Sequence, residues 1–131
     1  FAKDCVLSEN SRYGISIGHR DTDNVIRDCT IERNGEVGIL FRNEGAEFRA
    51  GHRNRIENCI IRDTGKDKAG IGIDIQGKTQ DITIRNTKLE NTTGGKQTTG
   101  IRIGKEAQRI ILEDNAFTGC PVQIEDLRTA R

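Results

Sequence analysis

One pattern returns along the whole chain: an Ile-x-x-Cys-x-Ile segment, a polar loop that contains glycine, and then a Gly-Ile-x-Ile segment. Its first isoleucine stands at Ile26, Ile56 and Ile84 and is replaced by Leu112 in a divergent copy, so the successive spacings are 30, 28 and 28 residues. A partial copy opens the chain. Self-similarity at such a period is typical of repeat proteins, in which each unit buries its apolar face only by stacking on a neighbour. The repeat therefore limits the kind of fold before any residue is given a role.

Each repeat reads as strands and turns. Pairs such as Ile39 and Phe41, or Ile73 and Ile75, alternate with other residues and place β-branched or aromatic groups on one side of a strand. Glycine, Asn, Asp and Thr fill the gaps, as they do in turns. The leucine-rich repeat has a similar spacing of anchors, but its middle anchor is bulky, and it has no second strand where this chain has Gly-Ile-x-Ile. The sequence predicts an all-β coil with at least two strands and a turn in each winding.

These motifs resemble the right-handed parallel β-helix of the pectin-lyase-like superfamily, and the resemblance covers nearly the whole chain. It implies an all-β solenoid of about five rungs, with residues 1–131 as a single domain. The chain starts at Phe1 and contains no Met, so we expect a fragment or processed form, such as part of a longer solenoid. In that family, inward polar residues stack as a ladder at one turn. The resemblance places in this ladder Cys5, Cys29, Cys59, Thr87 and Asn115.

Three further expectations concern the last repeat, the loops and the ends. Val122 and Ile124 are predicted to take the places of Ile101 and Ile103, and the longest loops are predicted at residues 42–53 and 64–70. No capping helix is visible in the sequence. Uncapped rungs expose strand edges, so end-to-end or side-by-side self-association is expected.

Composition excludes several classes of function. A net charge of +1 gives no bulk field for nucleic acid or an anionic membrane, and no apolar run is long enough for membrane insertion. Three of the four cysteines share one rung position, where in-register side chains lie about 4.8 Å apart, farther than the Cβ separation of about 3.8 Å in a disulfide. Buried free thiols are the favoured interpretation. Zinc is not expected, because no Cys or His pair has ligand spacing.

The resemblance also implies a location for function. In the family, the face of the Gly-Ile-x-Ile strands forms a groove for polysaccharide, and a basic residue commonly removes a proton beside a uronic carboxylate. The same resemblance implies a secreted, periplasmic or cell-surface protein. Carried over by position, the candidate catalytic residues are His19, Arg42 and Asp74, and the candidate substrate-binding residues are Arg20, Glu44, Gln76 and Arg102.

Each candidate has a structural alternative. Asp74 and Arg102 fall on adjacent rungs, where they can form an ion pair of small energetic value. For His19, a solvated turn residue is the favoured interpretation, because nothing in the sequence supplies a partner for it. Residues 21–23 offer two carboxylates to Ca²⁺, fewer oxygens than the six to eight that this ion takes. Residues 91–93 match an N-glycosylation acceptor, a short pattern that often occurs without modification.

Two classes of function follow. The first is a carbohydrate-active module that binds or processes an acidic polysaccharide, as a lyase or epimerase would. The second is a noncatalytic structural or adhesion solenoid. No complete lyase, hydrolase or epimerase motif is present in the sequence, and the arrangement of the candidate residues on one face distinguishes the two classes.

Overall fold

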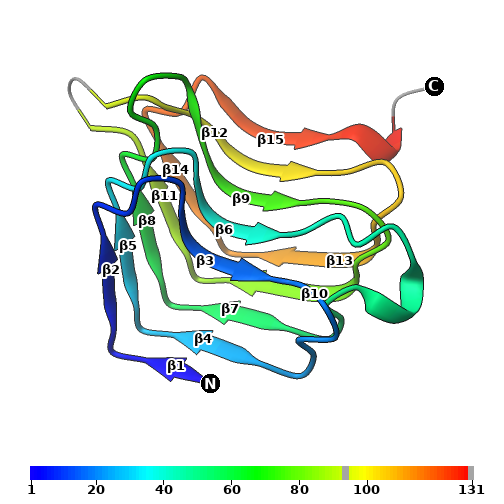
Figure 1. Ribbon diagram of the computed structural model, residues 1–131. Helices are drawn as coiled ribbons and strands as arrows, with labels where there is room; N and C mark the ends of the chain where they lie inside the picture. The colour runs from blue at the N-terminus through cyan, green and yellow to red at the C-terminus, as the bar shows by residue number, and fades with distance from the viewer. Residues whose placement is uncertain (93–94, 130–131) are drawn as a thin grey trace.

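The chain winds into five rungs of three short strands each (Figure 1). This computed structural model describes residues 1–92 and 95–129. Sheet A contains β1 (Ala2–Lys3), β4 (Val25–Arg27), β7 (Arg55–Glu57), β10 (Gln80–Arg85) and β13 (Gln108–Glu113). Sheet B contains β2 (Val6–Ser8), β5 (Thr30–Glu32), β8 (Ile60–Arg62), β11 (Lys88–Glu90) and β14 (Ala116–Thr118). Sheet C contains β3 (Tyr13–Ile17), β6 (Val37–Phe41), β9 (Gly70–Ile75), β12 (Gln97–Ile103) and β15 (Val122–Asp126).

All strand pairs between neighbouring rungs are parallel, and the predicted parallel β-helix of about five rungs is confirmed. The described residues contain no α-helix, and their only helical turns are the short 3₁₀ segments η1 (Glu47–Arg49) and η2 (Leu127–Thr129). None of these helices is long and apolar enough to cross a bilayer. Thr93, the last residue of the glycosylation pattern, lies outside the described residues.

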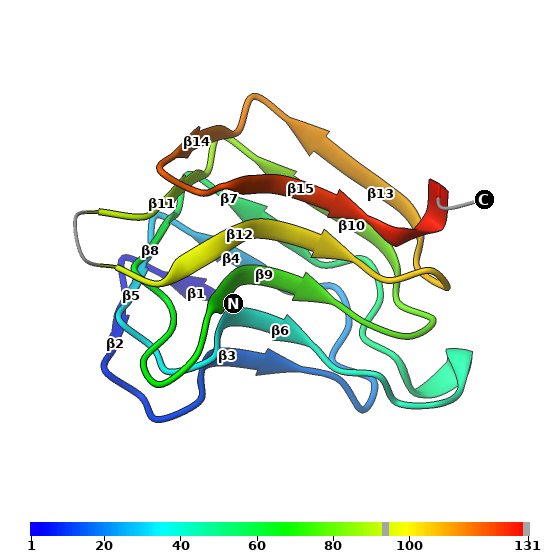
Figure 2. The ribbon, with the colours of Figure 1, turned by 90° about the horizontal axis from the view of Figure 1, so that it is seen from above.

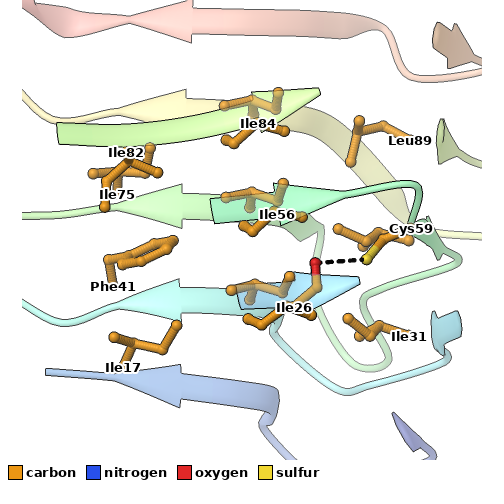
Figure 3. Close-up of a cluster of buried hydrophobic side chains, with 14 of the residues drawn as sticks. Ile17, Ile26, Ile31, Phe41, Ile56, Cys59, Ile75, Ile82, Ile84 and Leu89 are labelled. Carbon is orange, nitrogen blue, oxygen red and sulfur yellow. Dashed lines mark hydrogen bonds between the residues drawn. The ribbon is translucent and has the colours of Figure 1, made fainter. Parts of the chain in front are cut away.

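The core consists of columns of identical or similar side chains that run along the coil axis. Ile26, Ile56 and Ile84 are stacked in sheet A, and Ile31 and Ile61 are stacked in sheet B, all within 4% of complete burial (Figure 3). Equal positions of successive repeats meet because the rungs pair in register. The alternation seen in the sequence therefore identified the inward face correctly.

The glycine of Gly-Ile-x-Ile also points inward. A Cβ added at Gly38 would lie 2.7 Å from Cγ2 of Ile61, and one at Gly72 would lie 2.9 Å from Cδ1 of Leu89. Sheet C approaches sheet B too closely at this level for any side chain. Glycine recurs here because of packing between sheets, and its backbone angles at these positions are ordinary.

Side-chain amides at corners of the coil hydrogen-bond to the rung before them, and three of the four, those of Asn34, Asn54 and Gln97, are buried. Asn34 accepts a hydrogen bond from the N–H of Asn10 at 3.0 Å and donates one to the carbonyl of Leu7 at 3.1 Å. Three further amides make the same pair of bonds, to the backbone N–H of the equivalent earlier residue and to the carbonyl three residues before that. Asn54 binds the N–H of Asn24 and the carbonyl of Asp21, Gln97 binds the N–H of Thr64 and the carbonyl of Ile61, and Asn115 binds the N–H of Thr87 and the carbonyl of Ile84.

The predicted cysteine, threonine and asparagine ladder occupies the corner between sheets A and B. The backbone N–H of Cys59 donates to Oγ1 of Thr87 at 3.5 Å, and the Cys59 thiol lies 3.5 Å from the carbonyl of Ile26 (Figure 3). All four cysteines are free. The residue before each ladder position is left-handed, with φ between 49° and 56°, and is always Asp or Asn, the non-glycine residues that best tolerate this conformation: Asp4, Asp28, Asn58, Asn86 and Asp114.

Opposite charges alternate along several outward columns. In sheet A, Arg27, Glu57, Arg85 and Glu113 occupy one register position, and the Arg85 guanidinium makes two hydrogen bonds to Glu57. In sheet B, Arg62 lies between Glu32 and Glu90. The chain has nearly equal numbers of basic and acidic residues, 21 and 20, and this arrangement places many of them beside a residue of opposite charge.

The register predicted for the last repeat is wrong. Ile124 pairs with Ile101, Val122 pairs with Thr99, and Asp126 takes the place opposite Ile103. A shift of two residues keeps every side chain on the same face, so the alternating pattern does not distinguish the two registers. The inward position that an isoleucine was expected to fill holds a carboxylate, which Arg128 pairs at 2.7 Å.

Replacing Ile73 with aspartate should unfold the coil. Ile73 is fully buried between Ile39 and Ile101, and an unpaired buried carboxylate costs several kcal/mol, about the whole stability of a small domain. Ile111→Asp makes the same change at a 50% exposed position and serves as the control. Thermal unfolding followed by circular dichroism should separate the two variants; equal melting temperatures would show that the inward face is misassigned.

Replacing Asn54 with alanine should destabilise the fold by about 2 kcal/mol, because it removes two hydrogen bonds made by a fully buried side chain and leaves a gap in its place. Asn43→Ala, which removes one hydrogen bond in an exposed turn, should cost much less. Urea unfolding measures both. A smaller loss for Asn54→Ala than for Asn43→Ala contradicts the role given to the buried amides.

The Cys59 thiol should resist modification in the folded protein. Burial raises its pKa to about 11, so the thiol stays almost entirely protonated at mildly alkaline pH. The side chain is also inaccessible to reagents, because the residue is only 1% exposed. In a Cys5→Ser variant, which lacks the one partly exposed cysteine, we expect no native-state reaction with Ellman's reagent and release of the remaining thiols in denaturant. Rapid reaction of the native variant would contradict the buried ladder.

Candidate binding groove

The outward face of sheet C carries a shallow groove of about 330 Å³. Val37, Leu40 and Ile71 form an apolar floor, and Val37 and Leu40 are more than 90% buried although they point away from the core. The loop of residues 64–70 covers one side and contributes Lys68 and Ala69. The remaining lining residues are polar or aromatic: Tyr13, Glu36, Asp74, Gln76 and Arg102.

Three predicted site residues meet in this groove. Asp74 on β9 and Arg102 on β12 are paired by strand register, and Arg102 donates from Nε and Nη2 to the two Asp74 carboxylate oxygens at 3.1 and 2.7 Å. Gln76 donates to the same carboxylate at 3.0 Å. This pairing raises the pKa of Arg102, chiefly through the hydrogen bond to Asp74.

The ion pair is more consequential than expected from the sequence. The side chain of Asp74 is only 2% exposed, whereas that of Arg102 is 36% exposed. Loss of Arg102 would leave a nearly buried carboxylate with Gln76 as its remaining side-chain partner, and an uncompensated buried charge is strongly destabilising. Removal of Arg102 is therefore expected to cost more than removal of one partner of an exposed pair, because Asp74 is buried, which was not visible in the sequence.

Arg42 and Glu44 form a second group on the same face, nearer the first rung. Arg42 donates to Glu44 at 3.1 Å and to the Ser16 hydroxyl at 2.7 Å. Leu40 stands between Ser16 and Asp74 in the same outward column, so it separates this group from the Asp74 and Arg102 pair. Neither Arg42 nor Glu44 lines the groove.

His19 and Arg20 lie elsewhere, in the turn between β3 and β4. Both are exposed and have left-handed backbones, with φ of 48° and 70°. The backbone N–H of Arg20 donates to the carbonyl of Arg49, which fixes the turn. His52 and Arg53, a second His-Arg pair in the sequence, do not occupy the equivalent position, because Arg53 pairs across rungs with Asp23.

The two carboxylates considered for Ca²⁺ have other partners. Asp21 accepts a hydrogen bond from the N–H of Gly18 at 3.1 Å. Asp23 accepts two bonds from Arg53, which lower the pKa of its carboxyl. Among residues 1–92 and 95–129, no three His, Cys, Asp or Glu side chains gather in a way that suits a metal ion.

Sequence reasoning missed the residues that shape the groove. Tyr13 stands at one end with the Arg12 guanidinium 4.8 Å from its ring centroid, and Lys68 lies 3.4 Å from Glu36. Tyr13 occupies the same register column as Val37 and Ile71, a signal that the repeat could have provided. The folding of the 64–70 loop over sheet C has no such signal.

Comparison with known proteins agrees with this architecture. No curated protein and no solved structure gives a significant match. The family model described as "Right handed beta helix region" matches residues 1–129, almost the full chain and all five rungs. The chain therefore belongs to the right-handed β-helix family.

Proposed function

We propose that this β-helix is a noncatalytic module that binds an acidic polysaccharide along sheet C. The observation that carries the proposal is the groove itself, which combines an apolar floor, an aromatic residue at one end and charged residues along its sides. Apolar surface with a few fixed polar groups is the usual composition of a ligand site.

The surroundings of the candidate catalytic residues His19, Arg42 and Asp74 support binding rather than chemistry. Asp74 is buried and bound by both Arg102 and Gln76, and Arg42 is bound by Glu44 and Ser16. A general base must reach the proton that it removes. His19 lies in the exposed turn between β3 and β4 and is not among the groove residues, so the candidate catalytic residues do not converge on one reacting atom.

Cations at the groove support an acidic ligand. The Lys68 side chain is 68% exposed, and Arg12, 63% exposed, stacks over Tyr13 at the groove's end. Both pair with Glu36, but exposed pairs of this kind are weak, so a sugar carboxylate can compete for them. Tyr13 offers a ring to the apolar face of a sugar.

A structural solenoid is the second candidate, and the alternating charge columns favour it. Arg62 between Glu32 and Glu90, and Glu57 beside Arg85, satisfy charges within the surface rather than presenting them to a ligand. This interpretation predicts no saccharide binding at all.

Calorimetric titration with polygalacturonate, alginate and a neutral glucan tests the proposal. We expect binding of the uronate polymers, with affinity lowered about tenfold by Tyr13→Ala or Lys68→Ala, equivalent to about 1.4 kcal/mol each. Lys88→Ala changes an exposed lysine on sheet B and should have no effect. Arg102 is a poor choice for this test because its loss affects folding.

The same samples should be examined for unsaturated products by ultraviolet absorbance. Binding without product supports a noncatalytic module, whereas product formation overturns the noncatalytic assignment. Absence of binding to every polymer favours the structural solenoid.

A further inference from the structure

A second candidate site lies at the corner between sheets C and A, where the connecting loops of successive rungs differ in length. Residues 42–54 connect β6 to β7, whereas only residues 76–79 and 104–107 make the same connection in the next two rungs. The long loop, with η1 at its tip, projects beyond the shorter turns (Figures 1 and 2). Beside this loop lie two adjoining cavities of about 330 and 480 Å³. They share Glu47 and Gln80, and together they are called the hollow.

The projecting loop is firmly attached. Ala50 is buried, and a Cβ added at Gly51 would lie 2.8 Å from Ile17 Cγ2, so the base of the loop packs on the core. The carbonyl of Arg49 accepts from Arg20 on the previous rung, and the N–H of Arg53 donates to Gln80 on the next rung. The hollow is therefore built before any ligand arrives.

Histidine 52 also holds the loop to β10, in a defined tautomer. The N–H of Gln80 donates to Nδ1 of His52 at 3.1 Å, so Nδ1 carries no proton. Nε2, which lies 2.6 Å from the carbonyl of Glu47, must then be the donor. His52 therefore fixes the position of η1 relative to Gln80.

The floor of the hollow is a connected polar network. The Gln80 side chain donates to Glu47 at 2.7 Å and accepts from Arg109, which in turn makes two hydrogen bonds to Asp81. These links lower the pKa of Asp81, chiefly through Arg109, and keep its carboxyl ionised. Each carboxylate retains lone pairs that can accept further hydrogen bonds, since an ionised carboxylate has about four acceptor sites.

Phe48 forms the apolar wall. Its side chain is 64% exposed, and the Arg49 guanidinium lies 5.3 Å from the ring centroid. Phe48 lines the hollow together with polar side chains, so its exposed ring can contact the apolar side of a ligand whose other side carries hydroxyl groups.

We infer that this hollow binds a neutral sugar ring, with the apolar face of the ring on Phe48 and its hydroxyl groups on Glu47, Gln80 and Asp81. The charges that line the hollow balance, with Arg53 and Arg109 against Glu47 and Asp81 in the larger part and Lys78 against Glu106 in the smaller. Arg53 makes two hydrogen bonds to Asp23 and Arg109 makes two to Asp81. Both guanidinium groups are therefore held by carboxylates more firmly than Arg12 and Lys68 at the groove on sheet C, and a neutral ligand is favoured. This site shares no lining residue with the groove on sheet C, so it does not depend on the function proposed above.

Titration with methyl hexosides of glucose, galactose and mannose, followed by NMR, tests the inference on the full chain. We expect saturable shifts of the Phe48 ring and the Gln80 side-chain amide for at least one hexoside, with Kd of about 1–10 mM for so small a ligand. Phe48→Ala should weaken binding at least tenfold, and Phe48→Tyr should retain it.

Phe1→Ala is a matched control, because Phe1 is 74% exposed and also has an arginine, Arg27, over its ring at 5.4 Å. It should leave the affinity unchanged, as should Tyr13→Ala in the groove on sheet C. The inference is overturned if no neutral hexoside gives saturable shifts, if Phe1→Ala and Phe48→Ala weaken binding equally, or if methyl galacturonide binds as well as the neutral sugars. Loss of polymer binding by Tyr13→Ala alone would concern only the function proposed for the groove.

Discussion

The whole structure depends on parallel, in-register pairing between rungs, and the corner amides secure that register. A corner turn leaves backbone N–H and C=O groups that strand pairing does not satisfy, and an unpaired buried group of this kind is costly. Asn34, Asn54, Gln97 and Asn115 satisfy one group of each type on the rung before them. Because each amide binds an equivalent pair of groups, it favours one alignment of the rungs over its neighbours.

In-register stacking also determines what the outer surface can do. Any residue type that recurs at one position becomes a column, so like charges would repel along the axis. Lys3 and Arg27 are neighbours of like charge in one such column, but from Arg27 onward the column alternates through Glu57, Arg85 and Glu113, so neighbouring charges attract. The two candidate ligand sites lie where a loop is longer than the equivalent loops of the other rungs. The groove on sheet C depends on the 64–70 loop, and the hollow beside Phe48 depends on the 42–54 loop.

The repeat made much of the fold predictable. Ile26, Ile56 and Ile84 identified the rungs, and alternation identified Ile73 as inward, because both depend on short-range periodicity. The alignment of the last rung was mispredicted, because a two-residue shift preserves the inward face and only pairing with β12 distinguishes the registers. Of the predicted site residues, Asp74, Gln76 and Arg102 do lie together, since they occupy neighbouring outward positions of adjacent strands. Tyr13 and Lys68 were missed as groove residues.

The sequence by itself determined the β-helix, its five rungs and its inward columns, because identical spacing brings identical positions together. Tertiary structure alone decided the environment of each outward residue. Whether Asp74 is buried, whether Arg42 reaches Ser16 and whether Phe48 stands beside a polar hollow all depend on how loops of unequal length fold over neighbouring rungs. Those loops do not repeat, so no periodic signal specifies their positions.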